Sequence, residues 1–212
     1  MSHLFTRNLT FQSNDLGRNA VLMLTFDADM LGLYEDFFPV AWKVSKFGKT
    51  GLCKAHITYT SQLAFSKPQV VDGNIIGAES CVKIDVSEKT TLTEADHVYH
   101  FSPPQAGASG VLQAVNNTGD VQDIAVGFMN EGDCIPTPVL YFNDVKDGSH
   151  VTAQFAPVLR AYVTTACQET EIIRSEIASP VMWSHDLATL AKDTTWNLER
   201  NPVTGQFAIV KA

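Results

Sequence analysis

The sequence predicts an all-β fold: an antiparallel β-sandwich or jelly-roll-like single domain that spans residues 1–212 and carries one or two short helices. Apolar and polar side chains alternate along many short segments, which places one set in a core and the other in water. Turn residues separate these segments at short intervals. Long amphipathic segments of the kind that cross between parallel strands are missing from the sequence, which argues against a βαβ fold.

The alternation is clearest in segments that are each five to seven residues long. They are residues 5–11, 40–45, 53–59 and 82–86. Glycine and asparagine tolerate the positive φ of tight reversals, and turns are therefore expected around Asp72-Gly73, Asp147-Gly148, residues 116–120 and residues 201–205. Together these signals predict about a dozen strands.

Two segments have the spacing of short helices. After Asp29, the apolar residues Met30, Tyr34 and Phe37 recur at helical intervals, and Pro39 would end the helix. Residues 185–192 follow Ser184, a good helix cap. We expect both segments to be helical.

The charge balance excludes two classes of partner. The chain has 15 Lys and Arg against 23 Asp and Glu, a formal net charge of −8. This field repels phosphate backbones and anionic lipids, so neither nucleic acid nor a membrane surface is expected as a partner. No apolar leader follows Met1, from which we expect a cytoplasmic protein with its four cysteines reduced.

Motifs for nucleotide binding and nucleophilic catalysis are missing from the sequence. There is no phosphate-binding or dinucleotide-binding glycine motif, and Ser109 lies in a string without the spacing of a nucleophile elbow. The carboxylates near Asp27 and Asp36 are interpreted as groups at the start of a helix and not as a metal site. The sequence identifies no cofactor, and we expect a protein that is not an enzyme.

His97 and His100 are the histidines with the most suggestive spacing. Three residues apart on a strand, they point to opposite faces, so we do not expect them to hold one metal ion together. Either histidine could still join a ligand from another segment, such as Cys53, His56 or Cys81. A metal-dependent hydrolase or a cupin-like oxygenase that uses His97 or His100 is therefore one alternative function.

Aromatic residues provide the main candidate site. Trp183 and His185 alternate on an extended segment and can face the same way, with Ser184 between them at the start of the expected helix. Trp42 or Tyr99 would supply an opposing wall. Such a corner suits a planar ligand with a carbonyl oxygen. The Trp183 indole would stack on the face of the ligand, and the helix N–H groups or His185 would bind the oxygen.

These observations favour a non-enzymatic binding protein for a small apolar or aromatic, pigment-like ligand. A lectin-like, carbohydrate-binding module is the nearest alternative. We also expect a homodimer, because open sheets have edge strands with unpaired backbone groups. Residues 4–11 and 206–211 are the candidate edges.

Overall fold

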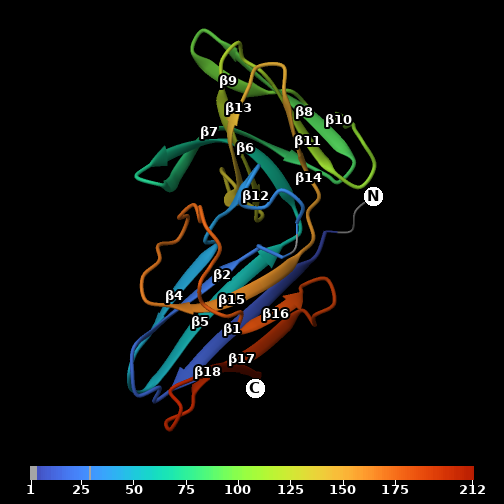
Figure 1. Cartoon of the computed structure of the whole chain (residues 1–212). Coiled ribbons are helices and arrows are strands. Elements are labelled where there is room, and N and C mark those ends of the chain that lie inside the picture. Colours follow the sequence, from blue (N-terminus) through green and yellow to red (C-terminus); the bar gives the residue numbers. More distant parts are fainter. Residues whose placement is uncertain (1–3, 29) are drawn as a thin grey trace.

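The computed structural model describes residues 4–28 and 30–212, and these residues form four β-sheets (Figure 1). The first sheet, in the order β18-β17-β1-β5, contains β1 (Thr6–Asn14), β5 (Leu52–Thr60), β17 (Asp193–Arg200) and β18 (Phe207–Lys211). The second, in the order β16-β15-β2-β4, contains β2 (Ala20–Thr25), β4 (Lys43–Phe47), β15 (Val158–Thr164) and β16 (Trp183–Asp186). The all-β prediction is confirmed.

The other two sheets form the upper half of the molecule in the view of Figure 1. The third sheet, in the order β3-β13-β12-β6-β7, contains β3 (Phe38–Pro39), β6 (Leu63–Val71), β7 (Asn74–Ile84), β12 (Gln122–Phe128) and β13 (Thr137–Val145). The fourth, in the order β10-β8-β11-β14 with β9 beside β8, contains β8 (Glu88–Ala95), β9 (Val98–Phe101), β10 (Gln105–Ala106), β11 (Leu112–Asn117) and β14 (His150–Ala153).

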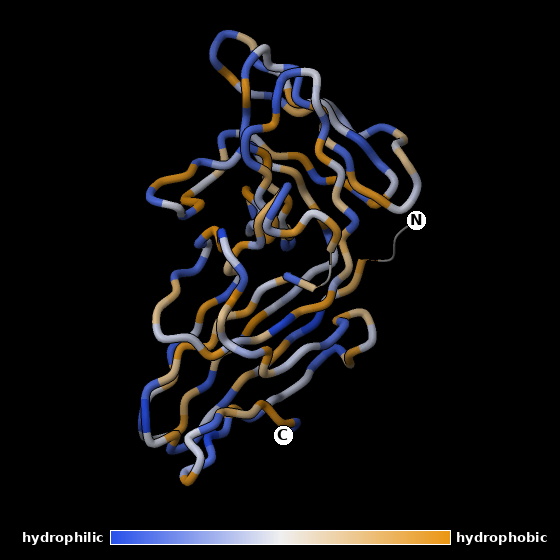
Figure 2. Tube along the Cα trace, in the orientation of Figure 1, coloured by the Kyte–Doolittle hydropathy of each residue, from blue (hydrophilic) through white to orange (hydrophobic). Residues whose placement is uncertain are grey.

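The period-two pattern of the sequence decides which side chains are buried. On β1, Leu9, Phe11 and Ser13 are buried, whereas Thr10 and Gln12 are only partly covered. Figure 2 shows the same mixture of apolar and polar residues along the strands of both halves. Strands of this kind have one face in the core and one face toward solvent.

One cluster of buried apolar residues includes strands from all four sheets. Phe11, Leu24, Phe65 and Leu112 represent the first, second, third and fourth sheets in it. The chain passes from the first sheet to the third through the short connection between Thr60 and Leu63, and from the fourth back to the second between β14 and β15. The division into a single domain stays a prediction.

Two strand pairs are parallel, which the antiparallel prediction did not include. β1 pairs in parallel with β17, and β8 pairs in parallel with β11. Parallel pairing needs a long connection between the partners. The connection contains the strands β9 and β10, which both pair with β8, in one case, and most of the chain in the other.

The predicted helices are wrong, because the described residues contain no helix. In the first segment Gly32 has a φ of +87° and Tyr34 a φ of +67°, which no α-helix accommodates. The backbone N–H groups of Glu35 and Asp36 both donate to the Gly32 carbonyl, so the segment is a compact loop. Asp29, the expected cap, lies outside the described residues.

The second predicted helix is replaced by a strand and a turn. Residues Trp183–Asp186 pair with β15 as strand β16. The Asp186 carboxylate then accepts a hydrogen bond from the Ala188 N–H at 2.8 Å, which forms a turn. Pairing with a distant strand therefore overrides the local helical pattern, which is too short to be stable alone.

The predicted edge at residues 4–11 is also wrong. β1 pairs with β17 on one side and β5 on the other, so its backbone groups are satisfied within the sheet. β18 is the outer strand of that sheet, and residues 206–211 keep an edge. Self-association stays a prediction.

Within the described residues there is no helix long and apolar enough to cross a membrane.

Candidate functional site

Trp183 and His185 lie side by side, as their alternation predicts, but they face the core. Their ring centroids are 4.8 Å apart, and Trp196 of β17 completes a trio at 5.1 Å from Trp183 and 4.9 Å from His185. Trp183 is only 5% exposed and also meets the edge of Phe11. The trio therefore packs the first sheet against the second, and Trp196 is the member that the sequence did not reveal.

The helix N-terminus expected beside this pair is not there, because β16 continues as a strand through Ser184. There are therefore no free helix N–H groups beside Trp183 to bind a ligand carbonyl, and the predicted helix end is not part of a site. The Trp183 indole N–H is buried and has no hydrogen-bond partner within the structure. A buried donor of this kind lowers stability.

Trp42 and Tyr99 lie in different surroundings. Trp42 is 2% exposed and packs against Phe26 and Tyr59 in the aromatic centre of the core. Tyr99, on β9, accepts a hydrogen bond from the Gln122 amide at 3.3 Å. Within the part of the chain that the structure describes, neither residue makes a ring contact with the trio.

The two candidate metal-binding histidines are solvent-facing. The His97 side chain is fully exposed in the β8–β9 turn, and its Nδ1 lies 3.6 Å from a carboxylate oxygen of Glu94. His100 is also exposed, on β9. Outside Met1–His3 and Asp29, no three His, Cys, Asp or Glu residues are grouped so that they could hold a metal ion.

The structure instead contains a groove between the strands β13 to β15 and the chain at Ala28 and residues 30–37. It consists of two cavities that share Leu31, Phe37 and Thr152 in their walls. The first has a volume of about 400 Å³ and is lined by Leu31, Asp36, Phe37, Phe142, Asn143, Asp144, Val145, Lys146, Ser149, His150, Val151 and Thr152. The second has a volume of about 530 Å³ and is lined by Ala28, Met30, Leu31, Phe37, Val111, Thr152, Gln154, Ala156, Val158 and Arg160.

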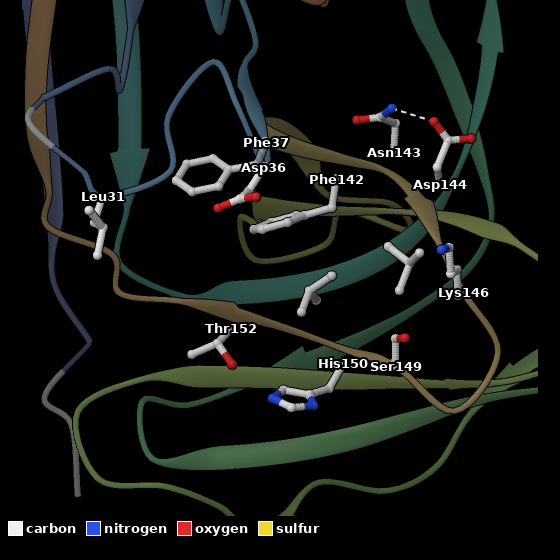
Figure 3. Close-up of a pocket in the computed structure, with 12 residues that line it drawn as sticks. Leu31, Asp36, Phe37, Phe142, Asn143, Asp144, Lys146, Ser149, His150 and Thr152 are labelled. Atoms are coloured by element: carbon white, nitrogen blue, oxygen red, sulfur yellow. Dashed lines mark hydrogen bonds between the residues drawn. The ribbon is translucent and has the colours of Figure 1, made fainter.

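The wall of the groove near β13 is aromatic and rigid. In Figure 3 the Phe37 and Phe142 rings lie together, facing Thr152 and His150 of β14 across the first cavity. The two ring centroids are 5.0 Å apart with an interplanar angle of 32°. Both rings belong to the buried core, which fixes this wall in position.

A buried asparagine holds the polar end of the groove. The Asn116 side chain is fully buried and donates to the carbonyl oxygens of Val145 and Asp120 at 2.8 and 2.7 Å. The Gly148 N–H in turn donates to the Asn116 carbonyl. Asn116 therefore fixes the turn between β13 and β14, the turn that the Asp147-Gly148 pair predicts, and with it Lys146 and His150.

At the opposite end of the groove, the lining residues Ala28 and Arg160 lie next to the buried Asp27. The Tyr162 hydroxyl donates to Asp27 Oδ2 at 2.5 Å, and the Arg160 guanidinium donates to the Asp27 carbonyl oxygen at 3.0 Å. Burial, together with the hydrogen bond and charge of Asp27, raises the pKa of Tyr162. Burial and the Asp27 charge likewise raise the pKa of Tyr34 to about 12. Both phenols therefore stay protonated at neutral pH, and Tyr162 remains a donor to Asp27.

The groove is a candidate site that the sequence did not reveal. Its lining comes from three separate stretches of chain, and most of its residues are common types without a motif. A comparison of the chain with family models, curated proteins and solved structures found no match.

Proposed function

We propose that this chain is a non-enzymatic binding protein, built on a β-sandwich frame, for a small amphipathic molecule with a flat apolar part. The observation that supports this is the pair of cavities of about 400 and 530 Å³ that share Leu31, Phe37 and Thr152 in their walls. Ligand sites in proteins have volumes of this order and combine apolar walls with a few polar groups.

The two ends of the groove differ in chemistry, and this difference supports a ligand with two different ends. Met30, Leu31 and Val158 make the wall of the second cavity mainly apolar. Lys146 and His150 give the first cavity donors, and the carboxylates of Asp36 and Asp144 give it acceptors, for a polar group. A ligand with one apolar end and one polar end satisfies both cavities at once.

A carbohydrate is the weaker candidate for this groove. Sugar rings bind best on an exposed aromatic face, but Phe37 and Phe142 are 7% and 4% exposed. Their contribution is that of a buried wall and not of a stacking platform. Catalysis through His97 or His100 stays a prediction without support from the groove, because neither residue lines it.

Leu31→Glu tests the proposal directly, because Leu31 is 102% exposed and its replacement removes no core contact. The probe is anilinonaphthalene sulfonate, which has flat apolar rings and one anionic group. We expect the wild-type protein to bind it saturably and the variant to raise its Kd by roughly tenfold or more, since an apolar contact worth about 1.5–3 kcal/mol is lost and a like charge is added. Fluorescence titration measures both constants.

Val203→Glu is the matched control, because Val203 is 91% exposed in the turn between β17 and β18. Both variants should keep the wild-type melting temperature, as surface substitutions usually change stability by less than about 0.5 kcal/mol. Equal probe affinity in Leu31→Glu and Val203→Glu would show that the groove does not hold the probe. The same holds if the wild-type protein fails to bind it.

A further inference from the structure

Two cysteines that are far apart in sequence meet at the edge of the third sheet. Cys81 lies on β7, and Cys134 lies in the loop between β12 and β13. The Cys81 thiol contacts the backbone carbonyl oxygen of Cys134 at 3.5 Å, across a separation of 53 positions. A disulfide also requires the two side chains to face each other, and this contact brings the Cys81 sulfur to the residue that carries the second thiol.

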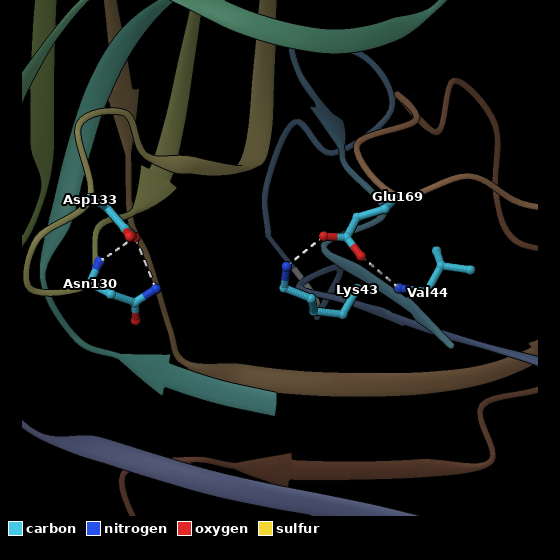
Figure 4. Close-up of polar contacts among 5 residues, drawn as sticks. All are labelled: Lys43, Val44, Asn130, Asp133 and Glu169. Atoms are coloured by element: carbon cyan, nitrogen blue, oxygen red, sulfur yellow. Dashed lines mark hydrogen bonds and ion pairs between the residues drawn. The ribbon is translucent and has the colours of Figure 1, made fainter. Parts of the chain in front are cut away.

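The loop that carries Cys134 is closed by its own hydrogen bonds. The Asp133 carboxylate accepts hydrogen bonds from the backbone N–H of Asn130 at 2.9 Å and from the Asn130 side-chain amide at 3.0 Å. Figure 4 shows this closed turn, in which Gly132 has a φ of +88°. Cys134 follows the turn directly and is therefore a defined, exposed neighbour of Cys81.

The other two cysteines lie in separate surroundings. The Cys53 sulfur accepts a hydrogen bond from the Gly48 N–H at 3.4 Å. The Cys167 thiol contacts the Met23 sulfur at 3.2 Å, and burial raises the pKa of Cys167 to about 12. A thiol with so high a pKa reacts slowly at neutral pH, because the thiolate is the nucleophile.

We propose that Cys81 and Cys134 form a thiol pair that is converted to an intramolecular disulfide by a small disulfide oxidant such as oxidised glutathione. Cys134 is exposed and attacks first, whereas Cys81 is partly buried and resolves the intermediate. Burial and the neighbouring Cys134 raise the pKa of Cys81, which supports this order.

Atoms and electrons balance in two exchange steps. The Cys134 thiolate attacks one sulfur of the oxidant, the S–S bond of the oxidant breaks, and one small thiol leaves with a proton. The Cys81 thiolate then attacks the Cys134 sulfur of the mixed disulfide and expels the second small thiol, which also takes a proton. The protein loses two protons and two electrons, and the oxidant takes up both pairs to become two thiols.

The bridge joins the β12–β13 loop to the outer strand of the third sheet. The loop residues Ile135 and Pro136 line a cavity of about 170 Å³ together with Ile76 and Gly77, so the disulfide closes the loop over this part of the surface. A disulfide stabilises mainly by restricting the unfolded chain, and the effect grows with the length of the loop it closes.

The test uses the double variant Cys53→Ser/Cys167→Ser, which keeps only the proposed pair. After exposure to oxidised glutathione, intact mass should fall by two hydrogens, and peptide mapping should join the peptides of Cys81 and Cys134. The melting temperature should rise by about 5–10 °C and return to its starting value after reduction. Adding Cys134→Ser should abolish the link and the shift.

Three results would overturn the proposal. The first is a stable mixed disulfide with glutathione on Cys134 that never resolves. The second is a disulfide between two copies of the chain, seen as a dimer under denaturing, non-reducing conditions. The third is a link in the wild-type protein that involves Cys53 or Cys167. If the double variant does not fold, intact mass and melting temperature are measured on the wild-type protein. Peptide mapping then shows which cysteines are linked.

Discussion

Trp42→Ala is expected to lower the free energy of unfolding by about 3–5 kcal/mol, the cost of deleting a large aromatic from a core. Trp42 is 2% exposed, and its ring lies 5.3 Å from Phe26, 6.0 Å from Phe128 and 6.3 Å from Tyr59. Deleting it leaves a cavity among rings that are fixed by one another, so the surroundings cannot collapse fully.

Urea unfolding measures this loss, and Val203→Ala, at a position that is 91% exposed, serves as the control with an expected change below about 0.5 kcal/mol. Under conditions where Trp42→Ala is folded, its affinity for anilinonaphthalene sulfonate should equal that of the wild-type protein. A small loss of stability combined with weaker probe binding would instead place Trp42 in the binding site, where the sequence predicted it.

Gly127→Ala is expected to lower the free energy of unfolding by about 3 kcal/mol, at the upper end of the usual cost of overpacking. A Cβ at this position would lie 2.3 Å from the Thr137 carbonyl oxygen and 2.8 Å from the Thr137 carbonyl carbon. These are backbone atoms of the paired strand β13, and the register between β12 and β13 already shifts between Val126 and Gly127. The strands must separate to admit the methyl group, which weakens their hydrogen bonds.

Gly48→Ala is the matched control, because a Cβ there would meet its nearest atom, the Cys53 sulfur, at an ordinary 3.5 Å. We expect it to change stability by less than about 1 kcal/mol. Thermal melts of the two variants separate a steric effect from the general effect of replacing glycine. Equal melting temperatures for both would contradict the close approach of β12 and β13.

The strands could be predicted from the sequence because their signal is local. Alternation along residues 5–11 and 53–59 is visible without any knowledge of their partners, and both segments are strands. The helices could not be judged locally. Residues 185–192 have a helical pattern. The conformation at the start of this segment is set instead by the pairing of β16 with β15, which lies about two dozen residues earlier in the chain.

Partners that are remote in sequence also explain the wrong edge. Nothing near residues 4–11 shows that β17 will pair with them in parallel, with Leu9 opposite Thr194. The same limit applies to the aromatic trio. Alternation places Trp183 next to His185, whereas Trp196 contacts both rings from another sheet. Because Trp196 fills the space beside the pair, these side chains pack in the core and do not line a pocket.

The groove was hidden for a related reason. Leu31 and Phe37 come from the loop before β3, while Lys146, Thr152 and Arg160 come from more than a hundred residues later. The exposure of Leu31 beside Gly32, whose φ is positive, becomes visible only in the folded chain. Surface loops of this kind often carry binding residues.

Mapping the binding position of anilinonaphthalene sulfonate by nuclear magnetic resonance tests the proposed groove most directly. In a titration of the isotope-labelled protein, we expect the largest backbone amide shifts at Leu31, Phe37, Lys146 and Thr152, which line the two neighbouring cavities. The largest shifts at Trp183, His185 and Trp196, or shifts spread evenly over the molecule, would contradict the assignment of the groove as the binding site.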